Sequence, residues 1–321
     1  MTSTYPPHSV ERDQWILAQR PPRESLDPRR PYAFLVEREC SATRELVSVA
    51  TIFLTNRECP WHCLMCDLWR NTLIETVPAG AIPEQIDYAL SQLPSARQVK
   101  LYNSGSFFDR NAIPTEDYPA IATRVSNFER TIVESHPSLL KENCLRFRDL
   151  VPNQLEVAMG LETVHPEILD RLNKRMTLDQ FSIAAEYLHS NEIDLRAFIL
   201  VQPPFMKTDE ALYWTERSLD FAFECGATAA TLIPTRAGNG AMEALARHGE
   251  FTPPRLDVVE SAASYGIGLK QGRVFVDLWD LRTISAACRN CHARRIERLQ
   301  KMNLGQCILA PVDCENCGGR S

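Results

Sequence analysis

The chain has 321 residues, of which 44% are hydrophobic and 24% charged, so it can bury one or two cores and is not a disordered protein. Its formal net charge of -6 disfavours attraction of the whole chain to nucleic acid or anionic membranes. Since no apolar run approaches the roughly 18 residues of a membrane span and residues 1–15 lack an apolar signal core, we expect a cytoplasmic protein without a membrane partner.

Along the chain, residues 1–45 come first, and we expect them to form an irregular N-terminal extension that wraps around the core. Four prolines interrupt this segment, at Pro21, Pro22, Pro28 and Pro31. Proline removes a backbone donor and restricts the residue before it, so regular elements tend to end there. Arginine alternates with acidic residues through the same segment.

From residue 46 to about residue 250, apolar β-branched runs alternate with stretches of helical period. Several runs are apolar on both faces, which is typical of strands in a buried parallel sheet. The predicted strands are Val47–Thr55, Val99–Asn103, Arg130–Glu134, Leu155–Leu161, Leu195–Gln202 and Ala227–Pro234. The predicted helices include Ile82–Leu93, Leu178–His189 after an N-cap at Thr177, and Asp209–Cys225 after an N-cap at Thr208.

Six β–α repeats within about 200 residues predict a parallel, right-handed α/β array. Six units are too few for a closed eight-stranded barrel, which leaves two architectures open. One is a partial (β/α)6 barrel and the other is a doubly wound sheet. Both place the chemistry at the C-terminal ends of the strands.

Three of the eleven cysteines follow the first predicted strand, at Cys59, Cys63 and Cys66. Thiolates are the ligands of iron–sulfur clusters, which normally need four, so three would leave one iron open to a substrate or cofactor. Two alternatives remain. The cysteines can be buried structural residues, or they can bind a structural zinc with His62 as the fourth ligand, although closed zinc sites usually use separated ligand pairs.

This spacing, in the loop after the first strand, resembles the signature of the radical S-adenosylmethionine (SAM) superfamily. The resemblance implies a [4Fe–4S] cluster whose open iron binds the amino and carboxylate groups of SAM. It also implies a one-electron donor such as flavodoxin or ferredoxin, reductive cleavage of SAM, and abstraction of hydrogen from a substrate by the 5′-deoxyadenosyl radical. The fold that it implies is the partial (β/α)6 parallel barrel, with residues 46–250 as the core domain.

The resemblance extends to the ends of the later strands and is to the branch of Elp3-like, MiaB-like and NifB-like enzymes. It implies that SAM contacts lie at these strand ends and on the helix that follows the fourth strand. Each such residue also has a structural alternative, because strand-end carboxylates often cap helices and a lysine at a helix end is often solvated. The expected SAM contacts are Asn103, Ser104, Gly105, Glu134, Glu162, Lys174 and Gln202.

Shorter strings resemble the subgroup around archaeosine synthase. They are Cys66–Trp69, Tyr102–Asp109 and Gly249–Pro254. This resemblance implies that the substrate is a modified, deazaguanine base in tRNA. Two alternatives stay open: a radical SAM enzyme that acts on a small molecule or peptide, and a non-catalytic RNA-binding protein stabilised by metal.

Residues 251–321 break the β–α rhythm and are expected to form a Cys-rich C-terminal accessory domain. A helix is predicted at Leu256–Tyr265 and a strand at Val274–Leu278. The basic run Arg294–Arg298 is either a phosphate contact or a solvated helix face.

Two CxxC pairs lie in this last segment, Cys288 with Cys291 and Cys314 with Cys317. Each pair presents two thiolates from one turn, and two such pairs are typical of a tetrahedral zinc site. An auxiliary iron–sulfur cluster uses the same ligands. The sequence therefore predicts a second metal site, holding zinc or a second cluster.

Overall fold

The computed structural model describes residues 4–281 and 288–317, and one eight-stranded sheet forms its centre. The strands lie in chain order, with the first pair antiparallel and every later pair parallel. The strands are β1 (Ala33–Cys40), β2 (Leu46–Phe53), β3 (Gln98–Tyr102), β4 (Arg130–Glu134), β5 (Gln154–Glu162), β6 (Asp194–Val201), β7 (Ala229–Pro234) and β8 (Arg273–Val276).

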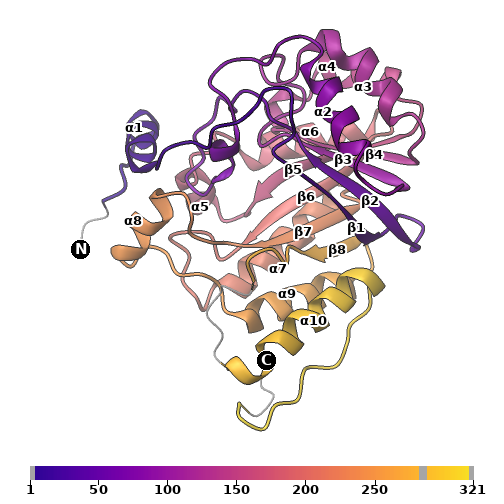
Figure 1. Ribbon diagram of the computed structural model, residues 1–321. Helices are drawn as coiled ribbons and strands as arrows, with labels where there is room; N and C mark the ends of the chain where they lie inside the picture. The colour runs from indigo at the N-terminus through magenta and orange to yellow at the C-terminus, as the bar shows by residue number, and fades with distance from the viewer. Residues whose placement is uncertain (1–3, 282–287, 318–321) are drawn as a thin grey trace.

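Helices follow the parallel strands and cover the convex face of the sheet (Figure 1). The α-helices are α1 (Ser9–Gln19), α2 (Ala81–Leu90), α3 (Tyr118–Val125), α4 (Glu142–Leu150), α5 (Pro166–Arg171), α6 (Leu178–His189), α7 (Ala211–Glu224), α8 (Ala241–Arg247), α9 (Leu256–Leu269) and α10 (Arg289–Gly305). In the part of the chain that the structure covers, no helix is both long and apolar enough to cross a membrane.

Alternate residues of each strand point to opposite faces, and the two faces differ in chemistry. On β5, Leu155, Val157 and Met159 belong to the main apolar core beneath the helices. The residue between the first two, Glu156, points to the concave face and pairs with arginines of other strands. The sheet is therefore apolar on its convex face and polar inside its curve.

A buried network of charges fills the concave face near the N-terminal ends of the parallel strands. Glu156 pairs with Arg130 at 3.1 Å, Arg196 at 2.6 Å and Arg273 at 3.1 Å. Arg196 continues to Glu39 of β1, at 2.6 Å. The network thus joins β1 to β4, β5, β6 and β8 across the concave face.

The first and last strands approach each other at this end of the curl. The guanidinium of Arg273 donates to the backbone oxygen of Cys40, at 3.4 Å, and Cys40 packs against Phe275. Helix α10 packs on both edge strands, β1 and β8. The result is an α/β half-barrel, as expected, in which the six predicted core strands are joined by the strand predicted near Val274 and by β1, which was not predicted.

Helix α10 also satisfies the free backbone edge of β8. The amide of Asn303 bonds both the N–H and the C=O of Val276, each at 2.8 Å. The amide of Gln306 does the same for Val274, at 2.7 and 2.9 Å. An exposed strand edge can template pairing with another chain, and this helix removes that edge.

The prediction of an irregular N-terminal extension was wrong. It contains α1 and the antiparallel strand β1, while the four prolines fall in the connection between them. The N-cap predicted at Thr208 was also wrong, because α7 begins at Ala211 after Glu210. The N-cap at Thr177 was confirmed, with a capping box to Gln180.

The three-part domain division stays a prediction. Within the segment expected to be accessory, α9 begins at the predicted Leu256, and β8 covers most of the predicted strand. Strand β8 pairs with β7 and so belongs to the same sheet as the core strands.

Candidate functional site

The cysteine loop follows β2 at the C-terminal edge of the parallel strands and is held by backbone contacts. The N–H of Leu64 donates to the backbone oxygen of Leu172, at 2.9 Å. The amide of Asn173 donates to the backbone oxygen of His62 at 2.8 Å. The amide of Asn239, after β7, donates to the backbone oxygen of Leu64 at 2.8 Å and to that of Cys66 at 3.1 Å. Segments from two distant parts of the chain thus fix the loop.

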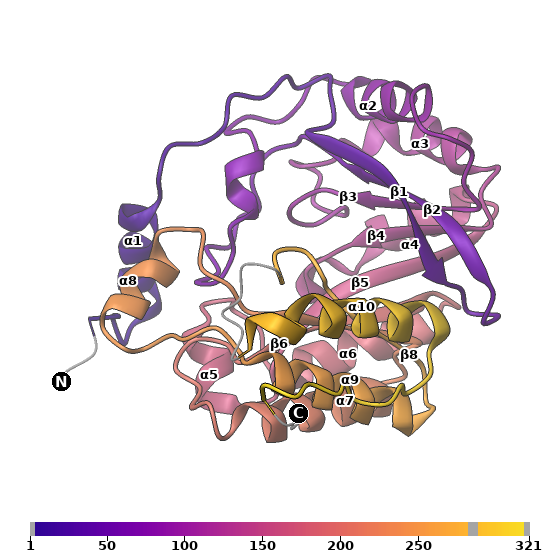
Figure 2. The same ribbon diagram turned by 60° about the horizontal axis from the view of Figure 1, so that its bottom comes forward.

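The N-terminal extension braces the same loop from outside. Leu64 is fully buried in a small apolar cluster with Ile16 of α1 and Met242 of α8, and Figure 2 shows these two helices side by side at one end of the molecule. Glu58, next to the first cysteine, pairs with Arg20 at 2.7 Å and with Arg23. The extension therefore helps to position the cysteine loop.

The thiols of Cys59, Cys63 and Cys66 lie in a low-dielectric environment. Burial raises the pKa of each to about 12. The nearby Lys174 ammonium lowers the pKa of Cys59 and Cys63 in part. Such thiols become thiolates when a metal binds them, because coordination deprotonates them.

Glycine at position 105 lets the strand-end segment approach the first cysteine. A Cβ on Gly105 would lie 3.2 Å from the Cβ of Cys59, closer than ordinary van der Waals contact. The backbone N–H of Asn103 donates to Glu134 at 2.6 Å, and that of Gly105 does so at 3.4 Å. The hydroxyl of Ser104 bonds that of Tyr32, at 2.9 Å.

The predicted residues Asn103, Ser104, Gly105 and Glu134 thus form one group beside the cysteine loop. Burial raises the pKa of Glu134 to about 7, although the backbone hydrogen bonds from Asn103, Gly105 and Ser104 act in the opposite direction. The group therefore holds a carboxyl that can change its charge near neutral pH.

Glu162 and Lys174 form a buried ion pair. Burial favours the neutral form of Lys174, but Glu162 and the neighbouring thiols outweigh it and raise its pKa. The alternative of a solvated helix-end lysine is therefore excluded. Gly160 makes room for the pair, because a Cβ there would lie 2.0 Å from a Glu162 oxygen and 2.2 Å from Nζ of Lys174.

Gln202 lies at the end of β6, and its amide nitrogen donates to the backbone oxygen of Thr252 at 2.9 Å. It also contacts the hydroxyl of Thr208 at 3.3 Å. Its hydrogen bonds within the described chain run toward these residues and not toward the cysteine loop.

Several buried polar atoms at these strand ends have no hydrogen-bond partner among the described residues. Both amide atoms of Asn103 are in this state, as are Oδ1 of Asn56 and Oε1 of Gln202. Buried polar groups are normally satisfied, so an unmet set marks a place for a polar ligand. Three of these atoms are amide oxygens that accept hydrogen bonds and one is an amide nitrogen that donates, a combination that fits the amino and ribose groups of SAM. The three thiols fit a cluster with one open iron.

Three residues at the strand ends have a left-handed backbone: Ser104, Glu162 and Gln202, with φ of 54°, 67° and 54°. Asn173 and Arg175, in the segment after α5, share it, with φ of 56° and 60°. Such conformations are costly for residues with a Cβ and are found mostly at functional sites.

Sequence reasoning missed His136 as part of the site. Its ring stacks on Trp61 of the cysteine loop, with centroids 3.8 Å apart and planes at 12°, and its Nε2 lies 3.0 Å from the backbone oxygen of Lys174. Burial lowers its pKa to about 3, with a further contribution from the Lys174 charge, so the ring stays neutral. Only its position two residues after Glu134 offered a signal.

A row of aromatic rings lies on the concave face, between the charge network and the C-terminal ends of the strands. On β3, Tyr102 comes two residues after Lys100, which pairs with Glu39 of the network. On β6, Phe198 comes two residues after Arg196, and the rings of Tyr102 and Phe198 lie 6.2 Å apart. The row continues through Phe53 to the exposed Trp279 and to Tyr32.

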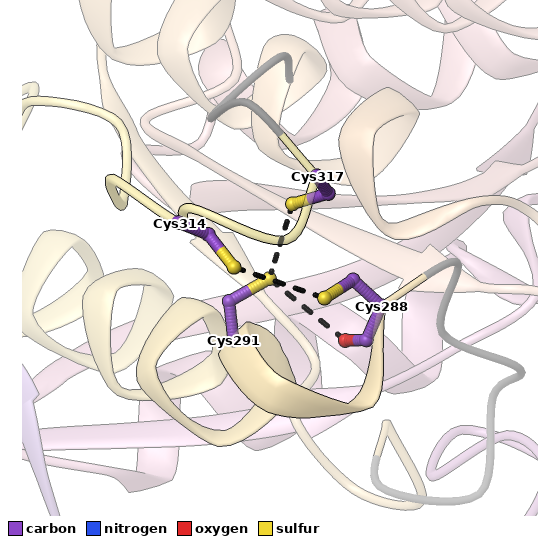
Figure 3. Close-up of side chains that lie close together, drawn as sticks. All are labelled: Cys288, Cys291, Cys314 and Cys317. Atoms are coloured by element: carbon purple, nitrogen blue, oxygen red, sulfur yellow. Dashed lines mark hydrogen bonds between the residues drawn. The ribbon is translucent and has the colours of Figure 1, made fainter.

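The second cysteine group is compact. The sulfurs of Cys288, Cys291, Cys314 and Cys317 lie within 4.8 Å of one another, so the four can bind a metal ion (Figure 3). Across residues 4–281 and 288–317, no other set of three or more Cys, His or acidic side chains meets that spacing. The three cysteines of the first loop do not meet it.

Two arginines of the basic run in α10 are engaged in contacts within the protein. Arg295 donates to Glu260 of α9 at 2.8 Å. Arg298 also donates to Glu260, at 3.2 Å, and it caps the backbone oxygen of Leu309. Arg295 and Arg298 are therefore inward structural residues, whereas Arg294 and Glu297 lie on the solvent-exposed face of the helix.

No family model matches the chain. It is 25% identical over 315 residues to an uncharacterized protein of Methanocaldococcus jannaschii, covering 91% of this chain and 86% of that protein. It is 26% identical over 218 residues to archaeosine synthase subunit beta of Methanosarcina acetivorans, covering 64% of this chain and 63% of that subunit.

Among solved structures, the chain is similar to an N-terminally truncated Elp3 of Methanocaldococcus infernus, with a TM-score of 0.51 and 13% identity. That match covers 68% of this chain and 59% of the Elp3 chain. Methylornithine synthase matches with a TM-score of 0.50 and 12% identity, covering 79% of this chain and 69% of that one. The chain thus has the fold of radical SAM enzymes and a distant sequence similarity to archaeosine synthase subunit beta.

Proposed function

We propose that this protein is a radical SAM enzyme in which Cys59, Cys63 and Cys66 hold a [4Fe–4S] cluster. The observation that carries the proposal is the set of three half-buried cysteines at the C-terminal strand edge, beside a glycine and a buried lysine. When bound, the cluster supplies one electron, delivered by a donor such as flavodoxin or ferredoxin, for reductive cleavage of SAM.

The residues at the ends of β3, β4 and β5 would bind and orient SAM. The unpartnered amide of Asn103 offers a donor and an acceptor, and Glu134 offers a carboxyl to the amino or ribose groups. The Lys174 ammonium, held by Glu162, would attract the SAM carboxylate. The loop contacts of Asn173 and Asn239 keep the cysteines in place while SAM enters and leaves.

For the substrate, we propose a modified base in tRNA, as in the deazaguanine modification implied by the archaeosine resemblance. The similarity to archaeosine synthase subunit beta supports this substrate class. The aromatic row from Tyr102 to Trp279 also supports it, because enzymes that act on a nucleic-acid base take it out of its stack and often hold it against aromatic rings.

The radical chemistry is tested with anaerobically reconstituted protein, dithionite and SAM. We expect 5′-deoxyadenosine and methionine to form, and we expect Cys59→Ala, Cys63→Ala and Cys66→Ala to lose this activity. Cys307→Ala is the matched control, because Cys307 lies outside both cysteine groups. Retained activity in the three loop variants would contradict the proposal.

The substrate is tested by binding to total tRNA across a salt series. Affinity that falls steeply with salt supports contact with phosphates, and a flat response counts against tRNA. Tight tRNA binding without any SAM cleavage would favour a non-catalytic RNA-binding protein. Rapid SAM cleavage without tRNA binding would favour a small-molecule or peptide substrate.

A further inference from the structure

We propose that Cys288, Cys291, Cys314 and Cys317 bind a single zinc ion, and that this ion fixes helix α10 across the two edges of the half-barrel. The proposal concerns a site outside the cysteine loop and does not depend on radical chemistry. It rests on the sulfur geometry, on the burial of two of the four ligands and on the contacts of α10.

The sulfur distances fit one tetrahedral ion. Sγ of Cys288 lies 3.8 Å from Sγ of Cys314, and Sγ of Cys291 lies 3.8 Å from Sγ of Cys317 (Figure 3). A tetrahedron with zinc–sulfur bonds of about 2.3 Å has an edge of about 3.8 Å. A [4Fe–4S] cluster attaches each thiolate to a different iron, and a [2Fe–2S] cluster attaches two thiolates to each of two irons, so both need some sulfurs farther apart than the 4.8 Å that spans all four here. The geometry favours zinc over a second cluster.

The ligands form a closed site. Four thiolates fill the tetrahedral positions, so no position stays open for a substrate, which is the mark of a structural zinc. Cys291 and Cys314 are buried, and burial protects the metal–thiolate bonds from water. This arrangement points to a role in folding and not to a role in catalysis.

The ion would join two segments that α10 separates. Cys288 is the N-cap of α10 and Cys291 lies in its first turn, while Cys314 and Cys317 follow the helix after an extended return. Along that return, Arg298 caps the backbone oxygens of Leu309 and Ala310, at 2.6 and 2.9 Å. The metal therefore closes a loop that contains the whole helix.

Helix α10 in turn covers the edge of β8. Its C-terminal half carries the Asn303 and Gln306 amides that satisfy the β8 backbone, and its first half is tied to buried Glu260 of α9 by Arg295 and Arg298. The apolar residues that α10 buries in the main core, Leu299 and Met302, lie in its second half. A metal link at the N-terminus would restrain the end of the helix that this packing does not reach.

The test begins with elemental analysis of the full chain purified in air without added iron. We expect one zinc per chain, and we expect the double variant Cys291→Ser, Cys314→Ser to lose it. Cys307→Ser, a nearby cysteine outside the group, should keep the zinc. Iron at this site, detected as visible absorption that disappears in the double variant, would overturn the proposal, as would the absence of any metal.

The link to α10 is tested by hydrogen exchange on the wild-type chain, before and after zinc is removed with a chelator, so that no variant has to fold. We expect exchange in residues 289–305 and in β8 to become at least about tenfold faster, because metal binding contributes directly to local folding free energy. Exchange in β4 and β5 should stay unchanged. Equal protection of α10 with and without zinc would refute the coupling.

Discussion

The ring of His136 stacks on the ring of Trp61, which lies between the first two cysteines of the loop, with the centroids 3.8 Å apart. The same imidazole reaches the backbone oxygen of Lys174. One neutral side chain therefore links the cysteine loop to the lysine proposed to meet SAM. Neither contact involves a charge, so His136 acts as a positioning residue.

We expect His136→Ala to lower the free energy of unfolding by about 1–3 kcal/mol, since it removes an aromatic stack and a buried hydrogen bond. His136→Phe should recover part of this loss because the stack remains. The iron content after reconstitution reports, independently of stability, whether the cysteine loop is still positioned to bind a cluster. This iron content should fall more in the alanine variant than in the phenylalanine variant. Equal iron content in both variants would show that the stack on Trp61 does not position the cysteine loop.

His136 also predicts a pH effect on stability. Its folded pKa, about 3, lies below the ordinary value of 6.5, so the unfolded chain binds the proton more readily. The contribution of the neutral His136 ring to stability is therefore fully present above about pH 6.5 and is lost as the pH falls toward 3. Urea unfolding of His136→Phe between pH 4 and 7 should show a shallower decline than the wild type.

Gly160 predicts a steric effect on the proposed SAM site. In Gly160→Ala the new Cβ would meet Glu162 and Lys174 at 2.0 and 2.2 Å, so the ion pair must move. We expect weaker SAM binding and a loss of about 1–3 kcal/mol in stability, as for other overpacked sites. Gly268→Ala in α9 is the control, because its Cβ would meet only Ile308 at an ordinary 3.7 Å. SAM titration by calorimetry compares the two.

The parallel strands could be predicted because the apolar, β-branched run that marks each strand lies within the strand itself. Arg130–Glu134 agrees with the observed strand, and Leu178–His189 agrees with the observed helix. Strand β1 was missed because its inward residues are charged, and charge suggests a surface. The partners that make Glu39 an interior residue, Lys100 and Arg196, lie 61 and 157 residues away along the chain.

In the candidate site, too, local motifs could be predicted and long-range contacts could not. The cysteine spacing and the strand-end motifs are short strings, so they could be read from the sequence. The residues that hold the loop could not, since Asn239 lies 175 residues from the Leu64 oxygen that it binds. An asparagine has no local pattern that reveals such a partner. Only the folded sheet brings the end of β7 to the loop after β2.

The charge network predicts a large effect at Glu156. In Glu156→Gln the three arginines around this side chain lose their shared negative partner, and breaking a buried ion pair typically costs about 3–5 kcal/mol. Glu129→Gln, which removes an exposed pair with Arg97, should cost less than about 1 kcal/mol. Similar losses of unfolding free energy in both variants would show that the buried charge network contributes no more to stability than an exposed ion pair.

Low pH should weaken the same network by protonating Glu156. Although burial opposes ionisation, the arginines around Glu156 lower its pKa to about 2. Its contribution to stability is therefore present above the unfolded pKa, about 4.3, and is lost as the pH falls toward 2. Thermal unfolding of the wild type should show this loss across that range, and Glu156→Gln should show a flatter profile.

The side-chain amides of Asn303 and Gln306 cover the backbone edge of β8. Asn303→Ala leaves both backbone groups of Val276 without their present partners, so we expect a loss of about 1–3 kcal/mol. Gln306→Ala should act similarly at Val274, while Gln300→Ala, on the exposed side of the same helix, should have little effect. A newly open strand edge also favours pairing between chains. Light scattering at raised concentration should therefore detect association in the first two variants, and monomeric behaviour in both would mean that α10 does not protect the edge.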